Sequence, residues 1–564
     1  MKSIPRIEYP NPQFERKNWI NLNGEWDFEI DYANNGKDCD WYKNKEFSRK
    51  ITVPFCMESE LSGVGIKDFA GAVWYRRNFT VPEEWKNGRT FINFGAVDYE
   101  ASVFVNGTLA GIHKGGYTPF KFDITGFLKD GANELVVYAM DDTRNPKQPS
   151  GKQSDKHFSY KCMYTRTTGI WQTVWLEYVP ENYIKNVKYY PDIENSVLNI
   201  EAEVYGSGIF TAEASYEGKI QGNVSVKAKT GILRASLKLD NLYLWEPLCG
   251  RIYDLKLTFG DDEVSSYFGM RNIEIDGYKV LINGKKVFQR TVLDQGYYKD
   301  GIYTAPDEAA LKKDIEISLE AGFNGARLHQ KVFEPRFLYH CDKLGYIVWG
   351  EYGNWGFDHS SPESITTYFG EWKEAVERDF NHPAIVGWIP FNETPDNQLP
   401  TLISSVYDYT KALDYTRPCI DASGWNHVKT DIFDVHNYLQ DAEILTKRLE
   451  LLKAENKLDF KSCKNYDGGP VFFSEYGGIK WVNENYDGWG YGNAPKTMEE
   501  FLERYNALTT MILNCDRIFG FCYTQLYDVE QETNGLYTFE REPKFDMEVI
   551  KKINTGISQY ERGE

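Results

Sequence analysis

The pattern of hydrophobic and polar positions divides the chain into three parts. From about residue 19 to 179, short alternating runs such as NELVVYAM are broken by turns and include few helical stretches, which is typical of an antiparallel β-sandwich. A second set of alternating runs follows a break at 180–182, and its length of roughly 90 residues favours a small immunoglobulin-like sandwich. We therefore predict a jelly-roll β-sandwich of the sugar-binding type over 1–181 and an immunoglobulin-like β-sandwich over 182–275.

The remaining residues, 276–564, show a different pattern. Short apolar runs alternate with helical segments such as DEAALKKDIEISLEAGF, which indicates βα units and a parallel sheet. The candidate strands are VFQRTVLDQG, GARLH, YIVWGEY, IVGWIPFNE, CIDAS, IFDVHNY, PVFFSEYG and IFGFCYTQL. Eight βα units in about 290 residues predict a C-terminal catalytic (β/α)8 TIM barrel, and hence a multidomain β plus α/β chain.

Polar or aromatic residues end all eight candidate strands. In a TIM barrel, catalysis occurs at the carboxyl ends of the strands. Contact with water explains any single polar strand end equally well, but eight together favour an active site. These residues are Asp294, Arg327 with His329, Glu351, Asn392 with Glu393, Ser423, His436 with Tyr438, Glu475, and Tyr523 with Gln525.

Two of these carboxylates suit glycoside hydrolysis. Glu393 ends the fourth strand and Glu475 the seventh, so we expect them to face one another across the barrel. In such hydrolases one carboxyl protonates the leaving oxygen, and the other attacks C1 from about 5 to 5.5 Å or activates water across about 6.5 to 9.5 Å. Spacing alone leaves the roles open, and Asp294 and Glu351 compete for them.

Several sequence blocks resemble glycoside hydrolase family 2, the family of β-galactosidases, β-glucuronidases and β-mannosidases. They are PQFERKNWINLNGEWDFEID, TTGIWQTVWLE, GFNGARLH, CDKLGYIVWGE, NHPAIVGWIPFNE and PVFFSEYGG, which occur in the family's order and cover nearly the whole chain. The resemblance implies a retaining exo-β-glycosidase that forms a covalent glycosyl-enzyme. It assigns Glu393 as the acid/base and Glu475 as the nucleophile.

The resemblance also implies roles for residues around this pair. Asn392 falls where the family holds the sugar 2-hydroxyl, and Tyr438 matches the tyrosine that bonds the nucleophile. Tyr523 falls where the family often has an aromatic sugar platform. Tyr164 and Arg166 resemble a jelly-roll segment that reaches the barrel, although an ion pair between domains explains Arg166 equally well. The predicted substrate-binding set is completed by Asp294, Arg327, His329, Gln330, Lys331, Glu351 and Trp355, the last of which is also consistent with loop packing.

The sugar is predicted from departures from the family pattern. Gln330, followed by Lys331, stands where β-galactosidases of this family have a histidine three residues after the strand-two arginine, and EYGG lacks the histidine of EYAH. The Asn-x-Lys clamp of β-glucuronidases is also missing, because Leu536 fills its lysine position. We predict that Lys331 pairs with a C6 carboxylate, so that the substrate is a β-hexuronide, with galacturonide slightly ahead of glucuronide. A β-galactoside is the alternative, and pairing of Lys331 with Glu334 is the structural alternative.

Composition and charge argue against nucleic-acid binding, membrane association and a disulfide-rich fold. The formal net charge of −19 opposes binding to nucleic acid or anionic membranes. The nine cysteines form no CxxC pair, and no segment offers about 18 uninterrupted apolar residues. These features predict reduced thiols and a soluble, cytoplasmic protein.

The expected partner is an oligosaccharide or glycoconjugate substrate. No metal site is predicted, because the eight histidines form no HExxH or HxH pair. The mechanism needs no cofactor, although some relatives hold Mg²⁺ or Na⁺. Relatives are often dimers or tetramers, which leaves a homo-oligomer open. The rival from another class is a non-catalytic carbohydrate-binding protein, which retention of both glutamates argues against.

Overall fold

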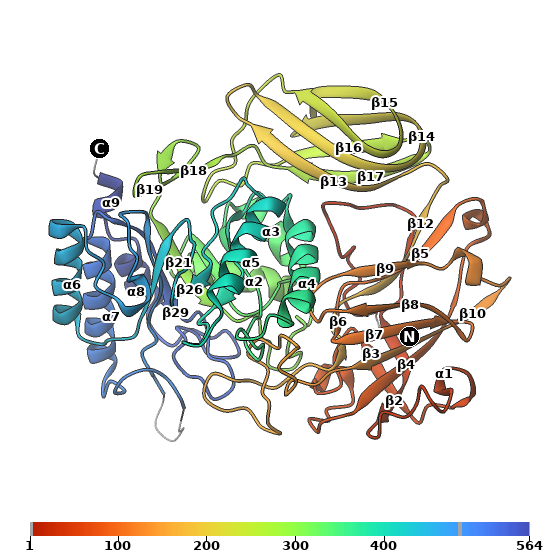
Figure 1. Cartoon of the computed structure of the whole chain (residues 1–564), viewed down its shortest axis with the longest axis horizontal. Helices are drawn as coiled ribbons and strands as arrows, with labels where there is room; N and C mark the ends of the chain where they lie inside the picture. Colours follow the sequence, from red (N-terminus) through yellow and green to blue (C-terminus); the bar gives the residue numbers. More distant parts are fainter. Residues whose placement is uncertain (1–3, 483–487, 563–564) are drawn as a thin grey trace.

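The computed structural model describes residues 4–482 and 488–562, and it contains three parts in chain order (Figure 1). Each part has its own cluster of buried apolar side chains, so three hydrophobic cores form. The predicted boundary at 181/182 lies between the last strand of the first part and the first strand of the second. The predicted boundary at 275/276 falls inside a strand that pairs within the third part.

The first part is an antiparallel sandwich. A six-stranded sheet of order β3-β2-β4-β10-β7-β8 packs against a four-stranded sheet of order β1-β12-β5-β9, and β6 pairs with β11. Alternate residues of β2, Trp26, Phe28 and Ile30, are buried in the shared core, as the sequence alternation predicts. The elements are β1 Trp19–Asn21, β2 Gly24–Asp31, α1 Trp41–Asn44, β3 Arg49–Val53, β4 Ala72–Thr80, β5 Arg89–Phe94, β6 Val97–Asp98, β7 Glu100–Val105, β8 Thr108–Lys114, β9 Phe120–Asp123, β10 Ala132–Met140, β11 Gly169–Ile170 and β12 Val174–Val179.

The second part is organised around one long hairpin. The strand β14 pairs with β15 along its length, while its other edge pairs first with β13 and then with β16. The change of partner coincides with a register shift between Val204 and Ser207. The immunoglobulin-like part predicted here is therefore built from one connected antiparallel sheet. Its strands are β13 Tyr183–Asp192, β14 Val197–Tyr216, β15 Lys219–Lys238, β16 Tyr253–Phe259 and β17 Asp262–Phe268.

The third part is the predicted TIM barrel. Its strands pair in parallel in the order β24-β23-β22-β21-β29-β28-β27, and β25 pairs with β26. Each predicted strand contains an observed one. They are β21 Gln289–Asp294, β22 Gly325–Leu328, β23 Ile347–Glu351, β24 Ile385–Ile389, β25 Phe391–Asn392, β26 Ala422–Ser423, β27 Phe433–Asn437, β28 Val471–Gly477 and β29 Ile518–Thr524. A small sheet of β18 Ile273–Asp276, β19 Lys279–Ile282 and β20 Lys285–Lys286 precedes them.

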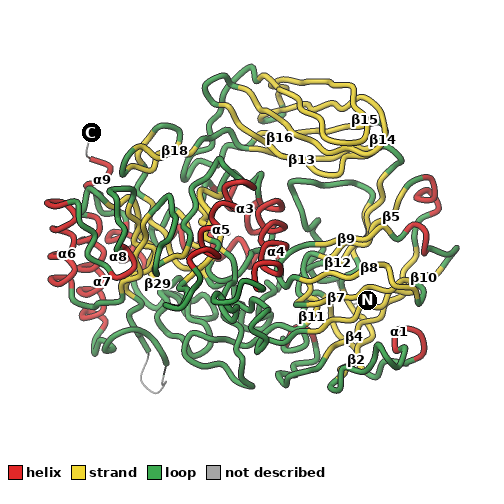
Figure 2. Tube along the Cα trace, in the orientation of Figure 1, coloured by secondary structure: helices red, strands yellow, loops and turns green. Residues whose placement is uncertain are grey.

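Helices surround the barrel strands (Figure 2). One βα unit departs from the predicted pattern, since the chain between β26 and β27, all of it described, contains no helix. The helices are α2 Glu308–Glu320, α3 Pro335–Leu344, α4 Ser364–Asp379, α5 Pro400–Leu413, α6 Ala442–Glu455, α7 Met498–Leu513, α8 Met547–Asn554 and α9 Gln559–Arg562. Within 4–482 and 488–562, none of the helices combines the length and apolar character that crossing a membrane requires.

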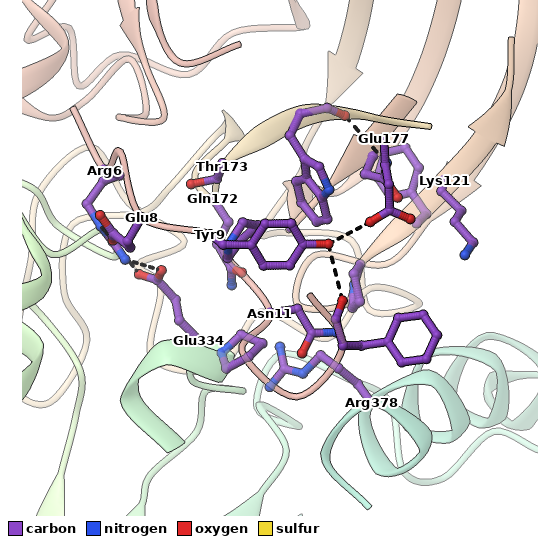
Figure 3. A pocket seen from close by; sticks show the side chains of 18 residues that line it. Arg6, Glu8, Tyr9, Asn11, Lys121, Gln172, Thr173, Glu177, Glu334 and Arg378 are labelled. Carbon is purple, nitrogen blue, oxygen red and sulfur yellow. Dashed lines mark hydrogen bonds and ion pairs between the residues drawn. The ribbon is translucent and has the colours of Figure 1, made fainter. Parts of the chain in front are cut away.

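The segment that precedes β1 holds the sandwich against the barrel. The Arg6 guanidinium forms a 2.8 Å ion pair with Glu334, next to α3 of the barrel. The Tyr9 hydroxyl donates a 2.6 Å hydrogen bond to Glu177 in β12 of the sandwich. These residues line a pocket of about 210 Å³ between the two parts (Figure 3). The first and third parts are therefore bridged by charged contacts that are largely shielded from water.

A second bridge is the long connection between β10 and β11, which leaves the sandwich and lies against the barrel. The backbone N–H of Ser150 donates to the carbonyl of Trp355 at 2.8 Å, and that of Gly151 donates to Gly353 at 3.1 Å. Gly151 has a φ of +59°, and a Cβ there would lie 2.4 Å from the Gln330 carbonyl oxygen. Glycine is therefore needed for this close approach, which brings sandwich residues to the carboxyl ends of the barrel strands.

Candidate active site

The two predicted catalytic glutamates lie together at the carboxyl ends of the barrel strands. Glu475 is in β28, and Glu393 follows β25 with a φ of 44° and donates its backbone N–H to Ser423 in β26. A carboxylate oxygen of Glu393 lies within 4.8 Å of one of Glu475. That closest approach is consistent with the short separation of about 5 to 5.5 Å that direct attack on C1 requires, rather than with the wider spacing of the inverting kind.

Glu475 accepts two hydrogen bonds, one on each carboxylate oxygen. Nη1 of Arg327 donates to Oε1 at 2.9 Å, and the hydroxyl of Tyr438 donates a short hydrogen bond to Oε2. The Tyr438 ring is itself held by Tyr491, whose ring stacks on it at 3.4 Å between centroids. Donors aimed at both oxygens fix the carboxylate in one orientation, as an attacking group requires.

Arg327 connects the acidic groups of the site. Its Nε donates to Glu351 at 2.6 Å, and its Nη2 donates to the side-chain oxygen of Asn392 at 2.5 Å. Burial alone would lower the pKa of this guanidinium, but the charges of Glu351 and Glu475 raise it. Because Arg327 engages the oxygen of Asn392, the Asn392 side-chain nitrogen is oriented away from it, and this buried donor has no partner among the described residues.

Glu393 is paired with His436, which the sequence analysis placed at a strand end but to which it gave no role. Nδ1 of His436 lies 2.7 Å from Oε1 of Glu393, and Nε2 lies 3.4 Å from Oε1 of Glu475. Burial opposes charge on both groups, yet the hydrogen bond with His436 lowers the pKa of Glu393, and the two glutamates raise the pKa of His436. Both directions favour the form of the pair in which His436 carries the proton.

The same three side chains are spaced closely enough to surround a metal ion, with one atom of each within 4.8 Å of the others. An imidazole that ligates a metal must be neutral. Because the pKa of His436 is raised by its acidic neighbours, against the effect of burial, the cluster is better suited to moving a proton than to holding a cation.

Glu351 and His329 lie beside this cluster. Glu351 accepts hydrogen bonds from Arg327 and from the backbone N–H of Gln330, so its carboxylate is occupied. His329 Nδ1 lies 3.0 Å from Glu351, and burial together with the charge of Lys152 holds the pKa of His329 well below its usual range. The side chain of Gln330 bonds Asn354 and the backbone N–H of Trp355, so it supports the loop rather than facing outward.

Lys331 does not lie where the sequence prediction placed it. Its side chain is buried, and its ammonium donates to the backbone carbonyls of Gly296 and Tyr303. The ring of Trp171 lies 5.2 Å from it, and burial lowers its pKa to about 7. A side chain enclosed in this way does not reach a sugar bound between Glu393 and Glu475, so the predicted carboxylate-binding role of Lys331 is withdrawn.

Asp294 is also directed away from the glutamates. Its carboxylate accepts from the Tyr527 hydroxyl at 2.5 Å and from the Gly296 backbone at 2.9 Å. Burial, with the nearby charge of Asp314, raises its pKa to about 6. These contacts place it in a structural network below the loops, and the substrate-binding role predicted for it does not fit.

Tyr523 and Arg166 occupy structural positions as well. The Tyr523 ring is fully buried and makes edge contacts with Tyr476 and with Tyr505 of α7, which is not the position of a sugar platform. Arg166 donates to the backbone of Lys156 and Lys67, and it lies 4.0 Å from Glu58, all within the sandwich. Arg166 therefore neither reaches the barrel nor forms the interdomain ion pair that was its alternative.

Tyr164 and Trp355 do lie at the interface between the sandwich and the barrel. The Tyr164 hydroxyl donates a short hydrogen bond to Glu532, which follows β29. The Trp355 indole N–H lies 3.3 Å from the Asn392 carbonyl, so its ring is close to the glutamates. Between these two aromatic rings lies the ammonium of Lys152, a residue that the sequence analysis did not single out.

The roles of His436 and Lys152 had unequal signals in the sequence. His436 was recognised as a strand-end residue, and it is two positions before Tyr438, so a place on the same face near the end of the sixth strand was available from the sequence. Lys152 lies in a long connection without regular structure, and no spacing rule points to one lysine there.

Comparison with protein families identifies the chain's relatives. The family described as "Glycosyl hydrolases family 2, TIM barrel domain" matches residues 273–559, and "Glycosyl hydrolases family 2, sugar binding domain" matches 20–180. The chain belongs to glycosyl hydrolase family 2. As a member of that family, it is a glycoside hydrolase, and glycosides are its substrates.

Two relatives and one solved structure illustrate its position in family 2. A β-galactosidase of Thermoanaerobacter pseudethanolicus is 28% identical over 75% of this chain, and the match spans 56% of that relative's length. A β-glucuronidase of Paenibacillus borealis is 24% identical over 96% of this chain and 97% of the relative. The structure of a β-glucuronidase from an uncultured Clostridium sp. superposes with a TM-score of 0.82 at 21% identity, over 97% of this chain and 99% of the other.

Proposed function

We propose that this family 2 hydrolase is a retaining exo-β-glycosidase, with Glu475 as nucleophile and Glu393 as acid/base. The observation that carries the proposal is that a carboxylate oxygen of Glu393 lies within 4.8 Å of a carboxylate oxygen of Glu475. Their different partners support the division of roles. Glu475 is held by the donors Arg327 and Tyr438, whereas Glu393 contacts His436, with which it can exchange a proton.

In the first step, an oxygen of Glu475 attacks the anomeric carbon as the bond to the leaving oxygen breaks. Glu393 gives that oxygen a proton, which the pair with His436 supplies. In the second step water attacks the same carbon, Glu393 accepts its proton, and the bond to Glu475 breaks. Two inversions at one carbon retain the β configuration. The unpaired nitrogen of Asn392 is free to donate to the sugar 2-hydroxyl.

For the sugar we propose a β-hexuronide, with glucuronide ahead of galacturonide. The sequence analysis placed galacturonide slightly ahead, on the strength of Lys331, but the burial of that residue removes the reason. Several relatives that align with most of this chain are β-glucuronidases, which supports the revised order. A β-galactoside is the second candidate, because one relative of higher identity is a β-galactosidase.

A panel of aryl β-glycosides tests both the retaining mechanism and the identity of the sugar. Release of the aryl group from glucuronide, galacturonide, galactoside, glucoside and mannoside is compared, and NMR identifies the first anomer formed. We expect fastest release from the glucuronide and a β product. An α product would refute retention. Sugar binding without release above a Glu475→Gln control would instead establish the non-catalytic binding protein.

We further propose an oligosaccharide or glycoconjugate as the natural substrate, with the exposed end of the sugar chain entering the site. The cytoplasmic location and the formation of a homo-oligomer stay predictions. Light scattering of the purified protein measures the oligomeric state directly.

A further inference from the structure

Lys152 places a positive charge of the sandwich beside the catalytic glutamates of the barrel. This residue is 5% exposed. The ammonium nitrogen lies 5.4 Å from the centre of the Trp355 ring and 5.7 Å from that of Tyr164. Trp355 in turn contacts the Asn392 carbonyl, directly before Glu393 in sequence. The ammonium therefore lies next to an aromatic ring that contacts the residue before Glu393.

This ammonium has no hydrogen-bond or ion-pair partner among the described residues. Burial tends to lower its pKa, but the charges of Glu532, Glu475 and Glu393 raise it, so the group stays positively charged. Lys331 offers a contrast, because its ammonium is bound to two backbone carbonyls and its pKa is lowered. A largely buried charge without a bonded partner is costly, and an anionic ligand that paired with it would offset that cost.

The backbone around Lys152 is held in place by contacts within the protein. Its carbonyl accepts a 2.8 Å hydrogen bond from the backbone N–H of Tyr164. The two preceding residues, Ser150 and Gly151, are bonded to the loop that carries Trp355. Anchoring on both sides holds the ammonium near one position, which lowers the entropy lost on binding.

The charges of the site explain why such a cation is needed. Glu351, Glu475, Glu393 and Glu532 lie at this end of the barrel, and Arg327 and His436 are already bonded to acidic partners. An anionic sugar entering among four carboxylates is repelled unless a further cation meets it. Lys152 is a cation that lies within electrostatic reach of both catalytic glutamates without being bonded to either.

We propose that Lys152 binds the C6 carboxylate of a β-hexuronide and so determines the preference for anionic over neutral sugars. This inference rests on the proposed function, since it assigns the sugar to the same site. It gives the sandwich, rather than the barrel, the residue that recognises the sugar acid, and it assigns that role to Lys152 in place of Lys331.

The test is the ratio of kcat/KM for an aryl β-glucuronide to kcat/KM for the matching aryl β-glucoside, each measured on the same protein preparation. A ratio does not depend on the fraction of correctly folded enzyme. We expect Lys152→Met to lower it at least about 30-fold, because truncating one partner of a desolvated ion pair has a large cost. Lys152→Arg, which keeps the charge, should recover most of the ratio.

The matched control is Lys331→Met, which removes a second buried lysine that contacts only protein groups. It should leave the ratio unchanged. An equal loss on both substrates in Lys152→Met would overturn the inference while leaving the hydrolase proposal intact. If the wild type cleaves neither substrate, the proposed preference for a glucuronide fails. Titration of D-glucuronate and D-glucose into wild type and Lys152→Met then tests the role of Lys152 by itself, and equal affinities for the two sugars would refute it.

Discussion

Nη1 of Arg327 donates a 2.9 Å hydrogen bond to Oε1 of Glu475, and both side chains are buried. The same guanidinium bonds Glu351 and Asn392, so one cation aligns the proposed nucleophile and the proposed 2-hydroxyl contact. A buried ion pair of this kind contributes little net stability relative to apolar residues, but removing one of its two charges is costly. The chemistry of Glu475 is therefore best probed with an isosteric substitution that keeps an acceptor for Arg327.

Glu475→Gln should lose roughly 10⁴-fold or more in kcat, because a covalent step has no substitute nucleophile. The amide keeps the shape and still accepts from Arg327, so thermal stability should change little. Mass spectrometry after reaction with an activated 2-fluoro-β-glycoside should find the sugar attached to Glu475 in wild type. Attachment at another residue would show that the nucleophile is misassigned.

Glu393→Ala should retain the first step for aryl glycosides with good leaving groups, since these depart without a proton. The second step then lacks its base, and added azide should replace water and yield a β-glycosyl azide. NMR of the product identifies the anomer. Wild type supplies the control, because azide should not accelerate it, and an α-glycosyl azide would contradict retention.

His436→Gln should move the alkaline limb of the pH profile to lower pH. In wild type the proton that the Glu393–His436 pair supplies is lost only as pH rises through the raised pKa of His436, whereas the variant has only the carboxyl of Glu393 to hold it. Activity is lost as pH rises through the pKa of the group that holds the proton. The measurement is kcat/KM against pH with an alkyl β-glycoside, whose departure needs a proton. A limb that stays in place or moves to higher pH would argue against proton sharing.

Lys331→Met should change stability in a pH-dependent way. Burial lowers the pKa of Lys331 to about 7 from 10.5, so between these pH values the unfolded chain binds a proton that the folded chain does not. Wild type therefore gains stability relative to the variant as pH rises from 7 to about 10, by on the order of 4 kcal/mol at most. Urea unfolding of both proteins at several pH values measures this difference, and a constant difference would refute the assignment.

The sequence was sufficient for the fold and for the two glutamates because both rest on regular patterns. Alternation places Trp26, Phe28 and Ile30 in the sandwich core, and eight apolar runs ending in polar residues predict the barrel and the edge where Glu393 and Glu475 lie. Hydrogen-bond register fixes how neighbouring strands pair. Because the barrel strands are parallel, a residue at the carboxyl end of any predicted strand is expected at the same edge of the sheet.

The other site residues depended on features that a linear pattern does not contain. Tyr523 and Lys331 were placed correctly along the chain, but their side chains point into packing contacts with Tyr505 and with the Tyr303 carbonyl. The direction is decided by neighbours that are distant in sequence. Lys152 was missed for the related reason that its position depends on how the sandwich docks on the barrel.

That docking, made close by Gly151, has an evolutionary consequence. The glutamates proposed to break the glycosidic bond and the lysine proposed to select the sugar belong to separate domains, joined in part through backbone hydrogen bonds. Substitutions at Lys152 in the connection between β10 and β11 are therefore expected to change which sugar is accepted while the catalytic residues of the barrel stay the same, provided that Gly151 is kept. Sugar specificity in proteins with this domain arrangement can therefore evolve separately from the catalytic residues.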